Sequence, residues 1–192
     1  MTKQQLLNTY YPGAVAAANG SGIFPQTLIS QLILESGYNL SKLATKYFNF
    51  FGIKATPAWG GKVVSLNTYE YNQNGGKYLV YGTNTLYVSY NAAIQAGADK
   101  MSLFRVYNST KQGFADYINF LKSNSRYKNV FKATTPQQQF TALQNAGYAT
   151  SSTYASDLTN IYNSIKNNLP TIAAAGGGLL ILATIAYFVF KK

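Results

Sequence analysis

The acidic residues of this chain are few enough to be considered one by one as catalytic groups. The sequence contains five, Glu35, Glu70, Asp99, Asp116 and Asp157, and it has neither cysteine nor histidine. The missing residue types exclude Cys-His and Ser-His-Asp hydrolases and remove the usual zinc ligands. Acid-base chemistry in this chain must therefore use these carboxylates, supported by tyrosine and lysine. We expect no metal and no cofactor.

Glu35 closes an apolar helical pattern in the stretch "LISQLILESGYN", residues 28–39. At about 100° per residue, it falls roughly 20° from Leu28 around the helix axis, so it borders the apolar stripe. Partial burial and the negative C-terminal end of the helix both favour the neutral carboxyl and raise its pKa. Those conditions suit a general acid that protonates a leaving oxygen. The pattern alone favours a plainer interpretation, a helix-end glutamate bonded to a lysine or to the following loop.

Glu70 lies in "NTYEYN", on a predicted strand that precedes the turn signal at residues 74–76. The pattern alone favours an exposed strand charge. The alternative is a second carboxylate on a mobile flap that faces Glu35. The remaining acidic residues are predicted to be ordinary surface charges: Asp99, Asp116 and Asp157.

Amphipathic helices are the elements that must position these groups. Helical periodicity is present in residues 26–36, in residues 112–122, in a helix opened by Pro136 and stopped by Gly147, and in residues 154–165. Residues 61–90 alternate and are rich in β-branched and aromatic residues, which predicts a β-hairpin or small meander. The expected fold class is α+β, mostly helical with one small β lobe.

The C-terminus differs in composition from the rest of the chain. Residues 172–190, "IAAAGGGLLILATIAYFVF", are uncharged and largely apolar, and Lys191 and Lys192 follow them. Such a segment is long enough to span a bilayer as a helix, although a buried terminal core helix is the alternative. We therefore predict a globular domain over residues 1–169 and a transmembrane helix with a basic end over residues 170–192, with lipid contact through residues 171–190.

The charge of the chain bears on its partners. The net charge is +11, which favours polyanionic surroundings such as nucleic acid, anionic lipid or an acidic cell wall. The lysines are spread along the chain and no nucleic-acid-binding motif is visible, so we expect no nucleic-acid partner.

Residues 1–25, whose short apolar run is interrupted by Pro12, predict a helix and a loop rather than a secretory signal.

A series of motifs resembles, in order, those of glycoside hydrolase family 73. They are "LILESGYN", "NFFGIKATPAWGGKV", "NTYEYN", "LFRVYNSTKQGFADYINFLKSNSRY" and "ALQNAGYATSSTYASDL". This family comprises peptidoglycan N-acetylglucosaminidases, among them autolysins and the hydrolase domain of flagellar rod-assembly proteins. The resemblance covers residues 5–166. It implies a lysozyme-like fold in which a helical body and a β lobe flank a glycan groove.

The resemblance also implies roles for individual residues. Glu35 matches the general acid of the family, Glu70 matches the glutamate of its β lobe, and Tyr148 matches a tyrosine held near the scissile sugar. The implied substrate-binding residues are Ser36, Asn49, Phe51, Lys54 and Trp59. A structural role is implied for the "FRVY" motif, which contains Arg105 and Tyr107.

The chain departs from the family pattern at several places. Ser151 stands where the family usually has aspartate, so any contact made by that aspartate is in doubt. Tyr38 replaces a common tryptophan. The segment between Glu70 and Phe104 is longer than in compact members, which could extend the flap or cover the groove.

The implied activity is hydrolysis of the β-1,4 bond after N-acetylglucosamine in peptidoglycan, with Glu35 as the general acid. Glu70 would position or deprotonate water or stabilise the developing charge, and participation of the substrate's own N-acetyl group is the competing route. An inactive wall-binding module is an alternative function. The missing signal and the apolar tail together favour a lytic enzyme anchored in a virion membrane, with a membrane-bound bacterial autolysin as the alternative.

Overall fold

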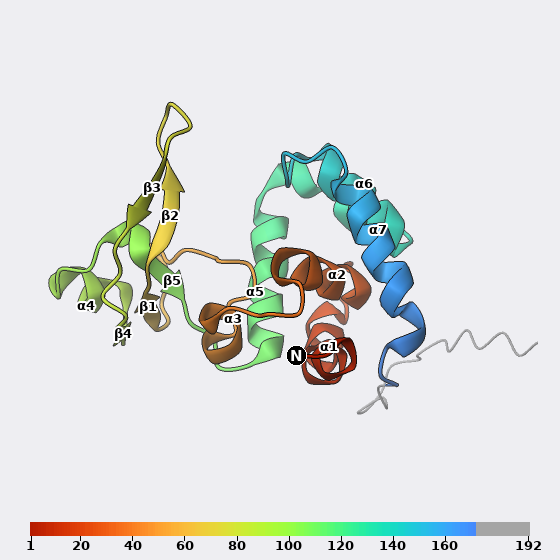
Figure 1. The fold of residues 1–192 in the computed structure, drawn as a ribbon, viewed down its shortest axis with the longest axis horizontal. Helices are drawn as coiled ribbons and strands as arrows, with labels where there is room; N and C mark the ends of the chain where they lie inside the picture. The colour runs from red at the N-terminus through yellow and green to blue at the C-terminus, as the bar shows by residue number, and fades with distance from the viewer. Residues whose placement is uncertain (172–192) are drawn as a thin grey trace, which may run out of the picture.

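A computed structural model describes residues 1–171, which form a helical body and a smaller β lobe that projects from it (Figure 1). The predicted transmembrane segment, residues 172–190, lies outside the described residues. Within residues 1–171, no helix is long and apolar enough to cross a membrane.

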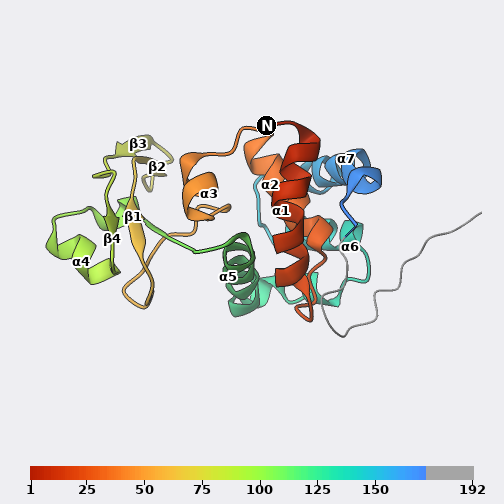
Figure 2. The same cartoon turned by 90° about the horizontal axis from the view of Figure 1, so that it is seen from below.

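The helical body is built from α1, α2, α5, α6 and α7 (Figure 2). α2 packs against both α1 and α7, while α5 covers α1 and α6 covers α7. The helices predicted from periodicity are confirmed, because their apolar stripes form one buried cluster. Their bounds are Lys3–Ala18 for α1, Pro25–Ser36 for α2, Thr110–Ser123 for α5, Pro136–Asn145 for α6 and Tyr154–Ile165 for α7. Short 3-10 helices are Ser125–Tyr127 (η2), Val130–Lys132 (η3) and Lys166–Asn168 (η4).

Pro12 lies inside α1, which runs without interruption to Ala18. A proline within a helix removes one backbone hydrogen bond and costs about 3 kcal/mol. Burial of one face of α1 offsets that cost, since the helix packs on α2 and α5 through Leu6, Leu7, Tyr10, Tyr11 and Ala14. The predicted N-terminal helix and loop are confirmed, with the loop beginning at Asn19.

The β lobe holds two small sheets rather than one meander. A three-stranded antiparallel sheet has the order β4-β1-β5, and β2 and β3 form a separate hairpin whose tip includes Gly75 at φ 75°. The hairpin within residues 61–90 is confirmed, but β5 lies outside that span and was not predicted. The strands are Val63–Ser65 (β1), Thr68–Tyr71 (β2), Lys77–Val80 (β3), Leu86–Tyr87 (β4) and Leu103–Arg105 (β5). Helix α4 covers Tyr90–Gln95, the 3-10 helix η1 covers Lys100–Ser102, and α3 (Lys42–Tyr47) lies between lobe and body (Figure 1).

A half-buried ion pair joins the β lobe to the helical body. Nη1 of Arg105, on β5, lies 2.9 Å from Oδ2 of Asp116, on α5, and the hydroxyl of Tyr107 donates to the same oxygen at 2.6 Å. The prediction that Asp116 is an ordinary surface charge is therefore wrong, since its side chain is only 16% exposed. A carboxylate held by two donors across an element boundary fixes the orientation of one element on the other. The structural role expected for Arg105 and Tyr107 follows from this network.

Candidate active site

Glu35 lies in the last turn of α2, which ends where Gly37 adopts φ 59° and donates its backbone N–H to the Ile33 carbonyl at 2.7 Å. The side chain is exposed on one side. Desolvation by the surrounding protein nevertheless raises the pKa of the Glu35 carboxyl. Within residues 1–171 this carboxyl has no ion pair and no hydrogen bond, so the alternative of a helix-end glutamate bonded to a lysine or loop finds no support there.

A groove of about 380 Å³ opens beside Glu35. It runs from the end of α2 along α3 to the loop that carries Phe51. Its walls include a carboxyl, hydroxyls, amides and aromatic rings, contributed by Glu35, Ser36, Asn39, Ser41, Asn49, Phe50 and Phe51. Polar groups set beside aromatic faces are the chemistry that a sugar-binding groove requires.

Phe51 and Ser36, two predicted substrate-binding residues, line this groove. The Phe51 ring stacks on the Tyr117 ring with their centroids 3.8 Å apart, so the position of Phe51 is set by the helical body. The Ser36 hydroxyl donates to the Leu32 carbonyl at 2.6 Å. This bond holds the hydroxyl against the last turn of α2. Their contact with substrate stays a prediction.

Asn49 lines the groove but uses its amide to shape the loop. The side-chain nitrogen donates to the carbonyls of Ile53 and Arg105, each at 2.9 Å, and the side-chain oxygen accepts the N–H of Ile53 at 2.9 Å. Only 2% of Asn49 is exposed. The Asn49 amide therefore holds the loop that presents Phe51, and its contact with substrate stays a prediction.

Tyr148 lies in a cluster of tyrosine rings within the helical body. Its ring centroid is 5.6 Å from that of Tyr154, 6.0 Å from that of Tyr127 and 6.1 Å from that of Tyr117. Burial raises the pKa of Tyr148 to about 12, and the charge of the nearby Glu35 adds to the increase. Its hydroxyl is thus protonated at neutral pH and can donate a hydrogen bond near Glu35.

Gln31 organises this cluster and was missed by the sequence analysis. Its side-chain nitrogen donates to the hydroxyls of Tyr117 at 2.8 Å and Tyr154 at 2.9 Å, and Gln31 is fully buried. It precedes Glu35 by one helical turn, so both side chains project from the same side of α2. A glutamine within an otherwise apolar helix face was the available signal, because a buried amide needs hydrogen-bond partners.

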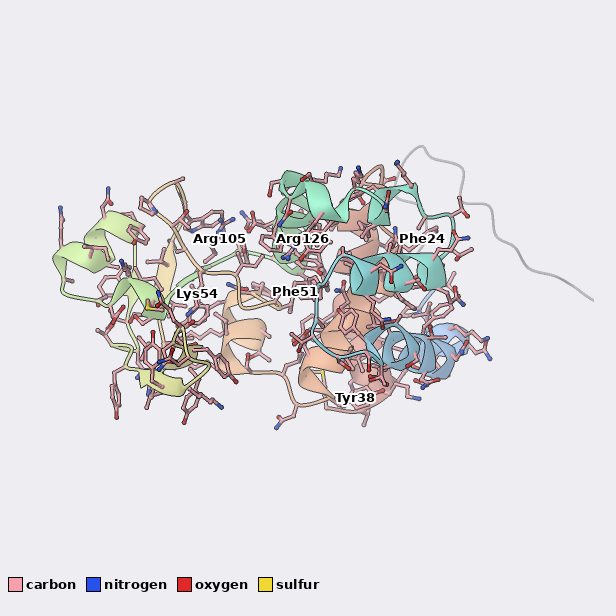
Figure 3. All side chains as sticks on the ribbon, turned by 90° about the horizontal axis from the view of Figure 1, so that it is seen from above. Phe24, Tyr38, Phe51, Lys54, Arg105 and Arg126 are labelled. Carbon is pink, nitrogen blue, oxygen red and sulfur yellow. The ribbon has the colours of Figure 1, made fainter. Side chains whose placement is uncertain are left out.

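Glu70 and Lys54 form a pair on the β lobe. Nζ of Lys54 lies 2.6 Å from Oε1 of Glu70, donates also to the Met101 carbonyl, and sits 4.1 Å from the centroid of the Phe104 ring. Figure 3 shows Lys54 toward the β lobe and Phe51 between that lobe and the helical body. The two predicted catalytic glutamates thus belong to different parts of the molecule, and within residues 1–171 no hydrogen bond or ion pair joins them.

Trp59 packs within the β lobe and does not line the groove beside Glu35. Its Nε1 donates to the Lys62 carbonyl at 2.9 Å, its ring meets Tyr107 edge to face, and the Arg105 guanidinium lies 4.8 Å from the ring centroid. This indole supports the Arg105 network. A contact with substrate by Trp59 stays a prediction.

Within the described part of the chain, no group of three acidic side chains gathers to hold a metal ion.

The glucosaminidase family model, described as mannosyl-glycoprotein endo-beta-N-acetylglucosaminidase, matches residues 11–167. The chain belongs to the glucosaminidase family. This span contains Glu35, Glu70 and Tyr148, and it agrees with the extent of the motif resemblance. The chain is therefore related to glycoside hydrolases over nearly all of its described residues.

Relatives of this glucosaminidase domain are longer proteins. The chain is 32% identical over 154 residues to "Peptidoglycan hydrolase FlgJ" of Salmonella typhimurium, covering 78% of this chain and 42% of that protein. It is 29% identical over 167 residues to "Probable N-acetylmuramidase" of Lactococcus lactis subsp. cremoris, covering 83% of this chain and 33% of that protein. The chain thus spans less than half the length of these curated relatives.

The predicted α+β, lysozyme-like fold of the glucosaminidase domain is confirmed by a solved structure. A C-terminally truncated glycoside hydrolase domain of Salmonella typhimurium FlgJ matches with a TM-score of 0.62 at 32% identity, covering 86% of this chain and 99% of that one. A helical body with a β lobe is therefore the shared scaffold, and the groove beside Glu35 lies within it.

Proposed function

We propose that this domain hydrolyses the β-1,4 bond after N-acetylglucosamine in peptidoglycan. The observation that carries the proposal is a glutamate, Glu35, that has a raised pKa and no ion pair within residues 1–171, at the edge of a groove in a glucosaminidase-family fold. The similarity to a peptidoglycan hydrolase supports the choice of substrate. The net charge of +11 supports it as well, because the stem-peptide carboxylates of peptidoglycan attract a basic protein.

Glu35 is the proposed general acid. A carboxyl whose pKa is raised remains protonated at a higher pH than an ordinary glutamate, so it can deliver a proton to the glycosidic oxygen as the bond breaks. The neutral hydroxyl of Tyr148, close enough for the Glu35 charge to affect its pKa, orients the acetamido group of the substrate or stabilises the transition state. Both groups come from the helical body.

Glu70 is the proposed second carboxylate, brought to the other side of the sugar by the β lobe. It positions or deprotonates water, or stabilises the developing positive charge. Inversion follows if the two carboxyls stand far enough apart to admit that water, and participation of the substrate's N-acetyl group is the competing route. The Lys54 ammonium, 2.6 Å from Oε1, holds the Glu70 carboxylate in a fixed position on the β lobe.

Identification of the new reducing end tests the bond specificity. Purified peptidoglycan is digested, the new ends are reduced with borohydride, and the hydrolysed sugars are separated. We expect glucosaminitol, the reduced form of N-acetylglucosamine after hydrolysis. Muramitol would instead assign cleavage after N-acetylmuramic acid, the activity named for the Lactococcus relative. Release of neither sugar alcohol would favour an inactive wall-binding module.

We further propose that residues 172–190 anchor the enzyme in a membrane, with a virion membrane as the setting and a bacterial envelope as the alternative. The support is the uncharged apolar stretch closed by two lysines. A wall-cutting domain on such an anchor would meet peptidoglycan as a particle enters a cell. Attachment to a membrane is the property that distinguishes this proposal from an enzyme that diffuses freely to the wall.

Sedimentation with uncharged phosphatidylcholine vesicles tests the anchor. The full chain is expected to sediment with the vesicles at high salt, because burial of apolar side chains is not screened by ions. A chain ending at residue 169 should stay in the supernatant. A full chain that also stays in the supernatant would rule out the anchor. Detection of the protein in bacterial envelopes but never in purified particles would reject the virion setting.

A further inference from the structure

A second cavity, of about 400 Å³, lies on the helical body outside the groove beside Glu35. It is formed where η2 and Asn129, just before η3, face α6 and the residue that follows it. One cation, several amides and two small apolar side chains line it, among them Arg126, Asn129, Asn145, Ala142 and Ala146. No acidic side chain contributes to the lining. A cavity with this lining suits an anion that also carries amide groups.

Arg126 has the features of an anion receptor. Its guanidinium lies 4.7 Å from the centroid of the Tyr127 ring. Within residues 1–171 it forms no ion pair, since the pairs found there are Lys54–Glu70 and Arg105–Asp116. A guanidinium supported on an aromatic face keeps its N–H groups available in a fixed plane, the geometry that binds a carboxylate through two parallel hydrogen bonds.

The part of the chain that forms this cavity carries charge of one sign. Between Asp116 and Asp157 the sequence contains no acidic residue, and four cations fall in this interval: Lys122, Arg126, Lys128 and Lys132. A local excess of positive charge draws anions toward the surface and raises their local concentration. Electrostatics and cavity lining therefore point to the same kind of ligand.

The cavity is connected to Tyr148 of the proposed active site through the chain and through ring packing. Ala146, in its wall, is followed closely by Tyr148, and the Tyr127 ring that supports Arg126 lies 6.0 Å from the Tyr148 ring. Figure 3 shows Arg126 on the side of the helical body nearer the β lobe. The cavity can therefore serve the same polymer only if a substituent of that polymer extends from Tyr148 past Asn145 and Ala146.

We propose that this cavity is a subsite for the peptide stem carried by the glycan, with Arg126 binding a carboxylate of the peptide. The amides of Asn129 and Asn145 then pair with peptide groups, and Ala142 and Ala146 form the apolar floor. The inference rests on the proposed function, because a peptide-bearing glycan must occupy the neighbouring groove. Its consequence is specificity: the domain prefers glycan that still carries its peptides.

Calorimetric titration with two soluble tetrasaccharides tests the subsite. One carries its stem peptides, and the other is the same fragment after an amidase has removed them. The full chain with Glu35→Gln serves as the background so that neither fragment is cut. We expect tighter binding of the peptide-bearing fragment, and we expect Arg126→Gln to weaken that binding on the order of tenfold while binding of the bare fragment is unchanged.

Lys128→Gln is the matched control, because it removes the same charge from an exposed residue of the same segment that does not line the cavity. It should leave the ratio of the two affinities unchanged. An equal loss of affinity for both fragments with Arg126→Gln, an equal effect of Lys128→Gln, or no detectable binding of either fragment would overturn the subsite. Cleavage of peptidoglycan by the wild-type chain is measured separately, so failure of the proposed function is distinguishable from failure of the subsite.

Discussion

Replacement of Glu35 by glutamine is expected to lower the rate of peptidoglycan cleavage by about 10²–10⁴-fold, the range that a general acid contributes. Glutamine keeps the shape of the side chain but has no proton of suitable acidity to give to the leaving oxygen. The measurement is kcat/KM for release of reducing ends from purified peptidoglycan. Near-normal activity of this variant would exclude Glu35 as the acid.

Protein stability provides the control for the Glu35 variant. Because the folded protein raises the pKa of this carboxyl, the folded state binds its proton more tightly than the unfolded chain does. Ionisation of Glu35 therefore disfavours the folded state as pH rises, and a neutral glutamine should leave Tm at neutral pH unchanged or slightly higher. Asp99→Asn is the matched variant, since asparagine can keep the cap that Asp99 forms on Met101, and its activity should equal that of the wild type.

The pH profile gives a second measure of the same group. The proton on Glu35 is present below its raised pKa and is lost as pH rises through that value, so wild-type kcat/KM should fall on the alkaline side at a pH above the usual pKa of glutamate. That alkaline limb should be absent from the residual activity of Glu35→Gln. An alkaline limb that survives in the variant would belong to another group.

Replacement of Glu70 by glutamine is expected to lower kcat on the order of 10²-fold with a smaller change in KM. The reason is that Glu70 acts in the transition state, on water or on the developing positive charge, rather than by holding the ground-state glycan. The change also breaks the ion pair with Lys54. The Lys54 side chain is 36% exposed and the Glu70 side chain is 24% exposed. An ion pair that is this exposed to solvent contributes little to the free energy of unfolding, so Tm should change little.

Lys54→Met separates catalysis by Glu70 from structural support of the β lobe. This variant removes the same ion pair but keeps the carboxylate. We expect its kcat to stay well above that of Glu70→Gln. Equal losses of kcat in the two variants, with equal losses of Tm, would mean that the ion pair matters only for the structure of the lobe.

Helical periodicity was a reliable guide to the body of this fold. The stripes that predicted α2, α5, α6 and α7 are the same residues that form the buried cluster, because a side chain's direction on a helix is set by its position along the chain. The β lobe was predicted less well. Strand β5 is three residues long and pairs with β1 from far along the chain, so neither local alternation nor a turn signal indicated it.

The candidate site likewise contains features that the sequence predicts and features that it does not. Glu35 could be singled out as a candidate from sequence because its helix, its apolar neighbours and its terminating glycine are all local, and the order of the motifs then favoured it as the acid. The pairing of Asp116 with Arg105 could not be found, and it is one of the contacts that hold the β lobe on the body. The hydrogen bonds from Gln31 to Tyr117 and Tyr154 likewise join residues far apart in sequence. Such contacts exist only after the chain has folded back on itself.

The sequence by itself determined the helical scaffold, the choice of Glu35 as the candidate acid and the family to which the chain belongs, since periodicity and motif order are properties of the linear chain. Only the tertiary structure decided which side chains surround Glu35, that Lys54 holds Glu70 on the β lobe, and that Arg126 has no carboxylate partner within residues 1–171. The physical reason is that desolvation and ion pairing depend on what lies within a few ångströms in space. Spacing along the chain does not specify those neighbours.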